Sequence, residues 1–122
     1  MIMVPETLKI ISLEEVGKLL DAEVFNGADL SVKVTSIGAA DLMSDVLALG
    51  RSGMLLLTGL VSAQVIRTAV VSDLCAVVFV RGKKPGEEIL SLARDANIPV
   101  LGTALTMFEA AGVLYGAVTG GE

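Results

Sequence analysis

The chain has 122 residues, a length that fits one domain, and 53% of its residues are hydrophobic. Even before its 13 glycines are counted, this share exceeds the roughly 45–50% that soluble domains reach with glycine included. Because a small domain buries only about two thirds of its surface, we expect an exposed apolar patch and self-association through it. The net charge of −5, three Phe, one Tyr and no Trp argue against a nucleic-acid partner.

Nothing in the sequence indicates a membrane or an export route. No window of about 18 residues is free of charged or turn residues, so we expect no membrane segment. The opening segment 1–4 is apolar, but Pro5 and Glu6 follow it directly and no basic region precedes it. We therefore expect no signal peptide and a cytoplasmic protein. The single cysteine, Cys75, lies in an apolar run and is expected to be a buried, inert thiol.

The first third of the sequence predicts short elements. Ser12 and Glu15 have the spacing of a capping box, and apolar residues then recur at helical spacing, so we expect a helix over residues 13–20. Residues 22–25 are typical of a strand that ends in the Asn26-Gly27 turn. Residues 31–37 alternate between apolar and polar side chains, which predicts a strand with one wet face.

The ends of the chain and the segment before the long apolar runs are less regular. Residues 41–47 have the spacing of a short helix, with Gly50 in the position of a C-terminal cap. Residues 1–7 and 118–122 are predicted to be flexible.

The remaining sequence repeats one pattern three times. Continuous apolar runs at residues 54–57, 76–80 and 99–101 are each followed by a break and then by a segment of helical spacing. Runs that are apolar at every position are typical of strands covered on both faces. We therefore predict a single α/β domain over residues 1–122: a mainly parallel sheet with helices on both faces, in which three C-terminal βα units follow a small βαβ-like piece.

These segments resemble the DRTGG domain family. The resemblance rests on Leu55-Leu56-Leu57-Thr58-Gly59, on residues 76–85 and on residues 97–103, and it extends over about residues 13–118. Residues 41–46 resemble small stand-alone members found near iron-only hydrogenase components. More distantly, the chain is similar to the N-terminal domain of HPr kinase/phosphorylase. The family's Asp-Arg and Thr-Gly-Gly positions carry Leu60-Val61 and Arg81-Gly82-Lys83 here, so only the middle glycine is kept.

The resemblance implies an accessory domain that is regulatory or dimer-forming rather than catalytic. Elsewhere such domains are joined to CBS-domain pyrophosphatases and to phosphotransacetylase. The implied partners are a second copy of the chain and, in addition, a redox-complex or metabolic enzyme subunit.

Many chemistries are excluded by the residues themselves. The chain has no histidine, which removes the commonest general base and the most frequent metal ligand. One cysteine cannot build a zinc or iron–sulfur site. Neither a P-loop nor a dinucleotide-binding glycine motif follows any predicted strand. We therefore expect no metal, no cofactor and no catalytic residues.

The predicted strand ends are the candidate binding site, because ligands of parallel sheets bind where strands end and helices begin. Hydroxyls, glycine amides and two cations gather there and suit a phosphate, a nucleotide or an acyl phosphate. The candidate residues are Asp41, Ser44, Asp45, Thr58, Gly59, Ser62, Arg81, Gly82, Lys83, Thr103 and Thr106.

Most of these residues also have a plain structural explanation. Ser62, Asp41 and Thr106 can be helix caps, Thr106 in a second capping box with Glu109, and Gly59 and Gly82 can form tight turns. Asp45 can be an exposed first-turn carboxylate, and Arg81 and Lys83 can be solvated. Two further functions stay open beside the regulatory domain. One is an accessory protein of a hydrogenase-type redox complex, and the other is a small phosphotransferase or acyltransferase that uses Asp41, Asp45 and Arg81.

Overall fold

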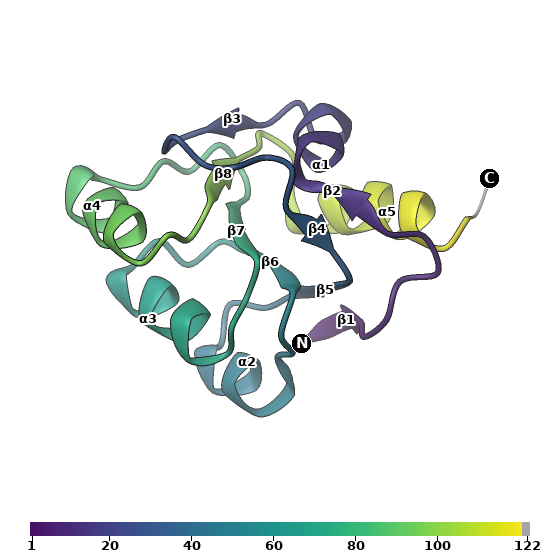
Figure 1. Ribbon diagram of the computed structural model, residues 1–122, viewed down its shortest axis with the longest axis horizontal. Helices are drawn as coiled ribbons and strands as arrows, with labels where there is room; N and C mark the ends of the chain where they lie inside the picture. Colours follow the sequence, from purple (N-terminus) through teal and green to yellow (C-terminus); the bar gives the residue numbers. More distant parts are fainter. Residues whose placement is uncertain (121–122) are drawn as a thin grey trace.

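The computed structural model describes residues 1–120 and is a three-layer α/β/α sandwich (Figure 1). A six-stranded sheet has the order β1-β5-β6-β7-β8-β3, and β2 pairs with β4 separately. The strands are β1 (Ile2–Val4), β2 (Ile11–Ser12), β3 (Glu23–Val24), β4 (Lys33–Val34), β5 (Ser36–Ala39), β6 (Met54–Thr58), β7 (Ala76–Phe79) and β8 (Val100–Gly102). The helices are α1 (Leu13–Leu19), α2 (Met43–Leu49), α3 (Ala63–Val71), α4 (Glu87–Asp95) and α5 (Met107–Val118).

The core of the sheet is four parallel strands that follow one another in chain order. In β5, β6 and β7 the residues Ala39, Leu57 and Val78 pair across the sheet, and Val78 pairs with Leu101 of β8. Every residue of these four strands is buried. The three apolar runs are therefore adjacent strands covered on both faces, which confirms the predicted fold class.

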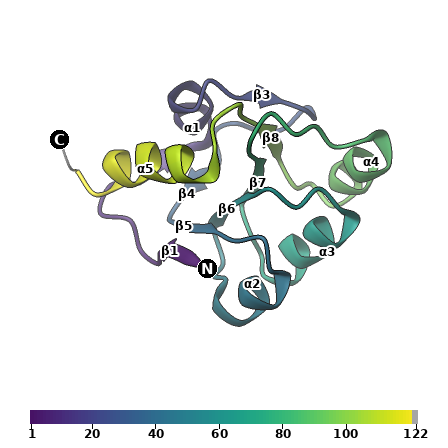
Figure 2. The same ribbon diagram turned by 180° about the vertical axis from the view of Figure 1, so that it is seen from behind.

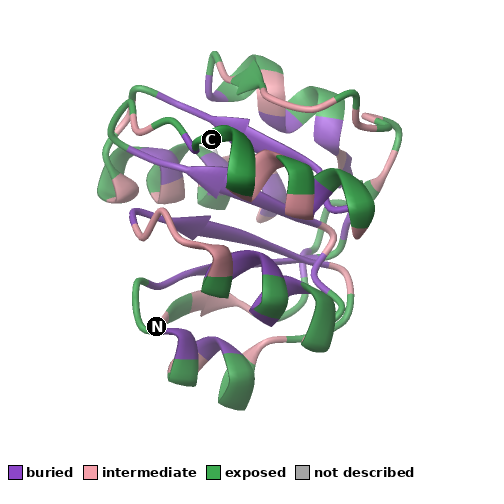
Figure 3. Ribbon diagram, turned by 90° about the vertical axis from the view of Figure 1, so that its left-hand side faces the viewer, coloured by how far each residue is buried: buried purple, intermediate pink, exposed green. Residues whose placement is uncertain are grey.

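Helices cover the sheet unequally. The side chains of α2, α3 and α4 pack on one face, around Met54, Leu56 and Phe79. Those of α1 and α5 pack on the other, around Leu55 and Leu57. Figure 3 shows the central strands buried throughout, while the helices are buried only on the sides that face them. The alternating residues of each strand thus feed two separate cores.

The N-terminal part has the strand-helix-strand order expected of a βαβ piece, but β2 and β3 lie in different sheets. The Ser12–Glu15 capping box is present and starts α1. After α1, β3 pairs antiparallel with β8 and forms one edge of the large sheet. β2 pairs antiparallel with β4 in a separate two-stranded sheet.

Two segments differ from the sequence prediction. Residues 31–37 contain parts of two strands, β4 and β5, and β5 adds a fourth parallel strand before the predicted three. The sequence did not indicate that β5 is a buried strand, because neither Ser36 nor Gly38 has an apolar side chain although both are buried. Residues 1–7, predicted to be flexible, include β1, which pairs antiparallel with β5 along residues 37–39.

At the other end of the chain the predicted flexible tail, residues 118–122, overlaps the helix. Val118 is the last residue of α5 and is buried. Residues 121–122 lie outside the described part. In residues 1–120 no helix is long and apolar enough to cross a membrane.

Cys75 lies directly before β7 and is largely buried. Burial raises the pKa of its thiol from the ordinary 9.0 to about 12. Because only the thiolate is a nucleophile, this side chain is chemically inert at neutral pH.

We predict that Cys75 reacts slowly with a disulfide reagent in the folded protein. A rise in pKa from 9.0 to about 12 lowers the thiolate population at pH 8 about a thousandfold relative to an ordinary thiol. Release of the reagent's chromophore, followed by absorbance with and without urea, measures this ratio. The folded-state rate should still climb about tenfold per pH unit between pH 8 and 10. Equal rates with and without urea would contradict the assignment.

Asn26 ties the edge strand β3 to the sheet, and its loss should destabilise the fold. The side-chain Nδ2 donates to the carbonyl oxygen of Ile98 at 2.8 Å, and Oδ1 accepts from the amide of Val100 at 3.0 Å. Replacing Asn26 by Ala leaves both backbone groups unpaired, at a cost of about 1–3 kcal/mol in the free energy of unfolding. Urea denaturation followed by circular dichroism measures this cost. The control Ser91→Ala, at an exposed position of α4, should change stability by less than about 0.5 kcal/mol.

Candidate functional site

The carboxyl ends of β5, β6, β7 and β8 lie at one edge of the sheet because the four strands are parallel. The turns that follow them are residues 40–42, 59–62, 80–86 and 103–106. Figure 2 shows the molecule from behind, where these strand-to-helix connections can be followed. This is the edge at which the sequence predicted a binding site.

Asp41 connects the first two of these turns. Its Oδ1 accepts a hydrogen bond from the amide of Gly59 at 2.7 Å and one from the hydroxyl of Thr58 at 3.2 Å. The structural explanation offered for Asp41, that it caps α2, is wrong. Leu42 is the N-cap residue and α2 begins without a side-chain cap bond. The Asp41 carboxylate instead holds the Thr58–Gly59 peptide in place.

The β7–α4 turn reaches across to the same glycine. Lys83 Nζ donates to the carbonyl oxygen of Gly59 at 2.6 Å. A Cβ on Gly59 would lie 3.5 Å from Arg81 Nη2 and 3.4 Å from Asp41 Oδ1. The missing side chain thus leaves room for a guanidinium and a carboxylate on one side of the backbone. We call Asp41, Thr58, Gly59, Arg81 and Lys83 the carboxyl-edge cluster.

Arg81 is held in an unusual backbone conformation. Its φ is 61° and that of Gly82 is 69°, and Lys83 N donates to the carbonyl oxygen of Val80 at 3.3 Å, as in a type I′ turn. The amides of Arg81 and Gly82 donate to the carbonyl oxygens of Leu105, at 2.7 Å, and of residue 103, at 2.9 Å. A residue with a Cβ costs about 1–2 kcal/mol in this conformation. Such strain often accompanies function.

Thr103 and Thr106 do not join the cluster. Thr103 is buried, and its hydroxyl donates to the carbonyl oxygen of Leu20 at 2.7 Å, on the α1 side of the sheet. Thr106 and Glu109 form the predicted capping box of α5. Hydrogen bonds from Thr106 also lower the pKa of the Glu109 carboxyl. Both threonines therefore have structural roles.

Within residues 1–120 no side-chain hydrogen bond joins Ser44, Ser62 or Asp45 to the cluster. Ser62 is at the N-cap position of α3, but its hydroxyl makes no capping bond and its Oγ is buried without a partner in the described residues. Ser44 is exposed on α2. Asp45 Oδ2 lies 3.3 Å from the amino group of Met1. Asp41 and Asp45 therefore do not form a carboxylate pair.

The cluster suits binding better than covalent chemistry. Two cations, Arg81 and Lys83, stand beside one carboxylate, Asp41, so its formal charge is positive. The hydroxyl of Thr58 is fully buried, donates to Asp41 and accepts from the amide of Leu60 at 3.1 Å. It is thereby unavailable as a nucleophile. Within residues 1–120 no group of three metal-ligating side chains is close enough to hold an ion.

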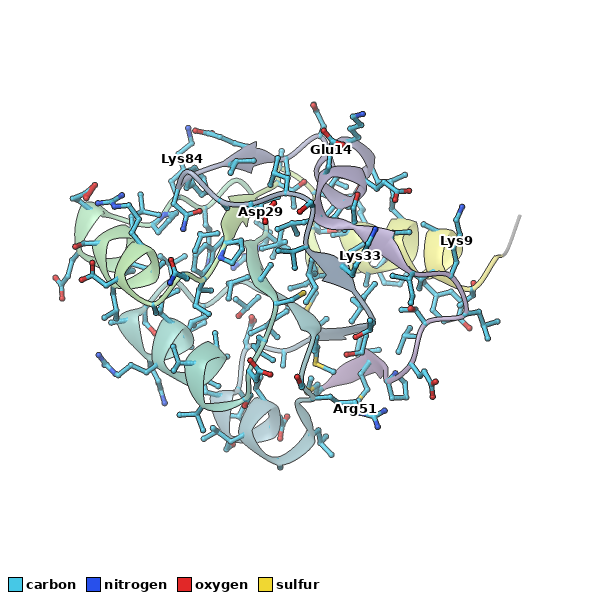
Figure 4. All side chains as sticks on the ribbon, in the orientation of Figure 1. Lys9, Glu14, Asp29, Lys33, Arg51 and Lys84 are labelled. Carbon is cyan, nitrogen blue, oxygen red and sulfur yellow. The ribbon has the colours of Figure 1, made fainter. Side chains whose placement is uncertain are left out.

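A hollow of about 670 Å³ lies at the opposite edge, which sequence reasoning did not single out. It is lined by Asn26, Gly27, Ala28, Asp29, Val32, Leu74, Cys75, Arg94, Asn97, Ile98 and Pro99. Several of its polar groups are engaged within the protein. Asp29, labelled in Figure 4, accepts from the amide and the hydroxyl of Ser31, which lowers the pKa of its carboxyl. Arg94 pairs with Glu87. The Asn26-Gly27 signal there indicates a turn.

Comparison with solved structures supports the fold. A crystal structure of the CBS and DRTGG domains of the regulatory region of Clostridium perfringens pyrophosphatase, complexed with the activator diadenosine tetraphosphate, superposes with a TM-score of 0.72 at 20% sequence identity. The match covers 88% of this chain and 47% of the other, so this chain spans about half of that protein's length. At this identity the likeness shows the fold alone. No curated protein matches the sequence.

A family model gives the assignment. The model of the DRTGG domain matches residues 15–117, which includes most of α1, the four parallel strands and nearly all of α5. Both the resemblance read from the apolar runs and the observed sheet agree with this match. The chain belongs to the DRTGG domain family.

Proposed function

We propose that this protein is a regulatory domain, without catalytic activity of its own, that binds a phosphorylated small molecule at the carboxyl-edge cluster. The observation that carries the proposal is the position of Arg81. A strained turn holds its guanidinium beside Gly59, where the chain enters α3. A glycine at residue 81 would adopt this backbone conformation without strain. The arginine at this position therefore indicates that its side chain has a function.

The chemistry of the cluster favours a phosphate group. A guanidinium binds phosphate oxygens through two parallel hydrogen bonds. The N-terminus of α3 adds the positive end of its dipole, and no side chain of the described residues caps it. Gly59 allows a ligand to approach the backbone closely.

Asp41 narrows the ligand class further. Its Oδ1 accepts the hydrogen bonds from Gly59 and Thr58. Its Oδ2 accepts none from these two residues and lies 3.7 Å from the position of a Gly59 Cβ. A carboxylate repels a bare phosphate but accepts hydrogen bonds from ribose hydroxyls. A nucleotide offers a phosphate to the cations of the cluster and ribose hydroxyls to the Asp41 carboxylate. The regulatory region of the pyrophosphatase, which shares the fold, was crystallised with a dinucleoside tetraphosphate, and this supports the same ligand class.

The alternative functions receive less support. A phosphotransferase or acyltransferase built on Asp41, Asp45 and Arg81 would need the two carboxylates to act together, but Asp45 pairs with the Met1 amino group. A role as accessory subunit of a hydrogenase-type complex stays a prediction that rests on the resemblance of residues 41–46. A cytoplasmic location, likewise, stays an expectation from the sequence.

The variant Arg81→Gly separates stability from binding. Glycine adopts the left-handed turn without strain, so the variant should unfold at the same or a higher temperature than the wild type. It should also lose the thermal stabilisation that nucleotides give. A ligand at about 100 times its dissociation constant stabilises a protein by about 2.7 kcal/mol, a shift that a dye-based melt detects. The panel is ATP, ADP, AMP, acetyl phosphate and inorganic phosphate.

The control is Arg67→Gln, which removes one positive charge from an exposed position of α3 and should leave the shift intact. No shift of the wild type with any member of the panel would refute the binding function. An undiminished shift in Arg81→Gly would place the ligand elsewhere.

A further inference from the structure

A polar hollow of about 350 Å³ lies at the amino end of β5 and takes no part in the proposed ligand site. We call it the Arg51 hollow. Its lining residues are Pro5, Glu6, Thr35, Ser36, Arg51 and Ser52, and all except Pro5 carry a charge or a hydroxyl. Small-molecule sites have volumes of about 300–1,000 Å³ and a mainly apolar lining. The Arg51 hollow is at the lower end of this range and is polar, so it suits a small polar ligand.

Three segments of the chain are tied together around this hollow. The amide of Thr7 donates to the carbonyl oxygen of Thr35 at 3.0 Å, and Nη1 of Arg51 donates to that of Pro5 at 2.8 Å (Figure 4). Gly53 has a φ of 82°, and a Cβ there would lie 2.6 Å from Oγ1 of Thr35. A glycine is therefore needed for the turn before β6 to approach the Thr35 hydroxyl. Backbone contacts thus hold the walls of the hollow in place.

Two hydroxyls at this place are buried without a partner. Ser36, which lines the hollow, is 2% exposed, and Thr7 beside Thr35 is 9% exposed. Neither Oγ of Ser36 nor Oγ1 of Thr7 makes a hydrogen bond within the described residues. Because buried polar groups are nearly always hydrogen-bonded, a polar occupant of the hollow supplies what the Ser36 hydroxyl lacks.

Two opposite charges line the hollow without pairing. Arg51 and Glu6 are both exposed, and neither takes part in an ion pair within residues 1–120. The bond to Pro5 uses one N–H group of Arg51 and leaves its other donors for a ligand. A second carboxylate, that of Asp73, accepts a hydrogen bond from the hydroxyl of Ser52. The hollow therefore offers a cation to one part of a ligand and carboxylates to another.

We infer that the Arg51 hollow binds a small zwitterion, an α-amino acid with a small or polar side chain. A guanidinium holds a carboxylate through two parallel hydrogen bonds, and the Glu6 carboxylate attracts an ammonium group. Glu6 and Asp73 repel a ligand that is only an anion, and Arg51 repels one that is only a cation. A ligand that carries both charges avoids both repulsions. Its polar groups also give the Ser36 hydroxyl a partner.

The inference is independent of the proposed function. The Arg51 hollow lies where β5 begins, whereas the carboxyl-edge cluster lies beyond the ends of β5, β6 and β7. No residue belongs to both. Binding of a nucleotide and binding of an amino acid are therefore separable results.

Titration of the isotope-labelled full chain with free glycine and with L-serine, followed by backbone amide chemical shifts, tests the inference. The largest changes should fall on Thr35, Ser36 and Ser52, with a dissociation constant at or below about 1 mM. Acetate and methylammonium each carry only one of the two charges. Each should bind at least about tenfold more weakly than free glycine, because one charged hydrogen-bond partner is lost.

Two variants separate the charges of the hollow. Glu6→Gln should weaken the binding of free glycine at least about tenfold and strengthen that of acetate, because it removes a repulsion. Arg51→Gln should weaken the binding of both. The matched controls are Glu88→Gln on α4 and Arg67→Gln on α3, at exposed positions outside the hollow, and both should bind as the wild type does.

The inference is overturned if neither amino acid moves these amides at about 10 mM, ten times the expected constant. Acetate that binds the wild type as tightly as free glycine does would also overturn it. So would binding that is undiminished in both variants, or changes centred on Gly59 and Gly82 instead.

Discussion

The architecture depends on the complete burial of four parallel strands that follow one another in the chain. Leu55, Leu56 and Leu57 have no exposed surface, and the same holds for Val77 and Val78 of the next strand. Strands buried on both faces must be linked by helices that cross from one end of the sheet to the other. Because strand order follows chain order, α2, α3 and α4 lie on one face, and every strand-to-helix turn falls at the same edge.

Two features of the molecule come from this one constraint. The turns at the carboxyl edge are brought together, so Asp41, Gly59 and Arg81 meet although they are far apart in the sequence. The opposite face is covered by α1, by α5 and by the β2–β4 pair, whose Ile11 and Val34 are buried in the same core as Leu55 and Leu57. The two faces of the sheet are therefore covered by different kinds of element.

Sequence patterns predicted what is local and missed what depends on pairing. The three apolar runs and both capping boxes, Ser12 with Glu15 and Thr106 with Glu109, were correct because their signals lie within a few residues. β5 was missed as a buried strand since Gly38 has no side chain of its own to signal burial. Gly38 is covered by Met1 and Met54, since Cε of Met1 and Sδ of Met54 lie within 3 Å of where a Gly38 Cβ would be. β1 was missed because its partner lies more than thirty residues away.

In the candidate site, too, the sequence indicated local features and missed contacts that depend on strand pairing. Thr103 directly follows β8 and Thr58 ends β6, yet the Thr103 side chain faces α1, and no nearby residue signals that difference. The bond between Asp41 and Gly59 depends on the register in which Ala39 faces Leu57. The left-handed turn at Arg81 is hidden as well, because arginine rarely adopts it. Residue types thus indicated the edge of the sheet, while register and backbone conformation decided which residues meet there.

We propose that a phosphorylated ligand binds at the carboxyl edge and not in the hollow at the opposite edge. Backbone amide chemical shifts of the isotope-labelled protein, recorded during titration with ATP, test it most directly. The largest changes should fall on Gly59, Gly82 and Lys83. Changes centred on Asp29 and Asn97, with the carboxyl-edge amides unmoved, would contradict it.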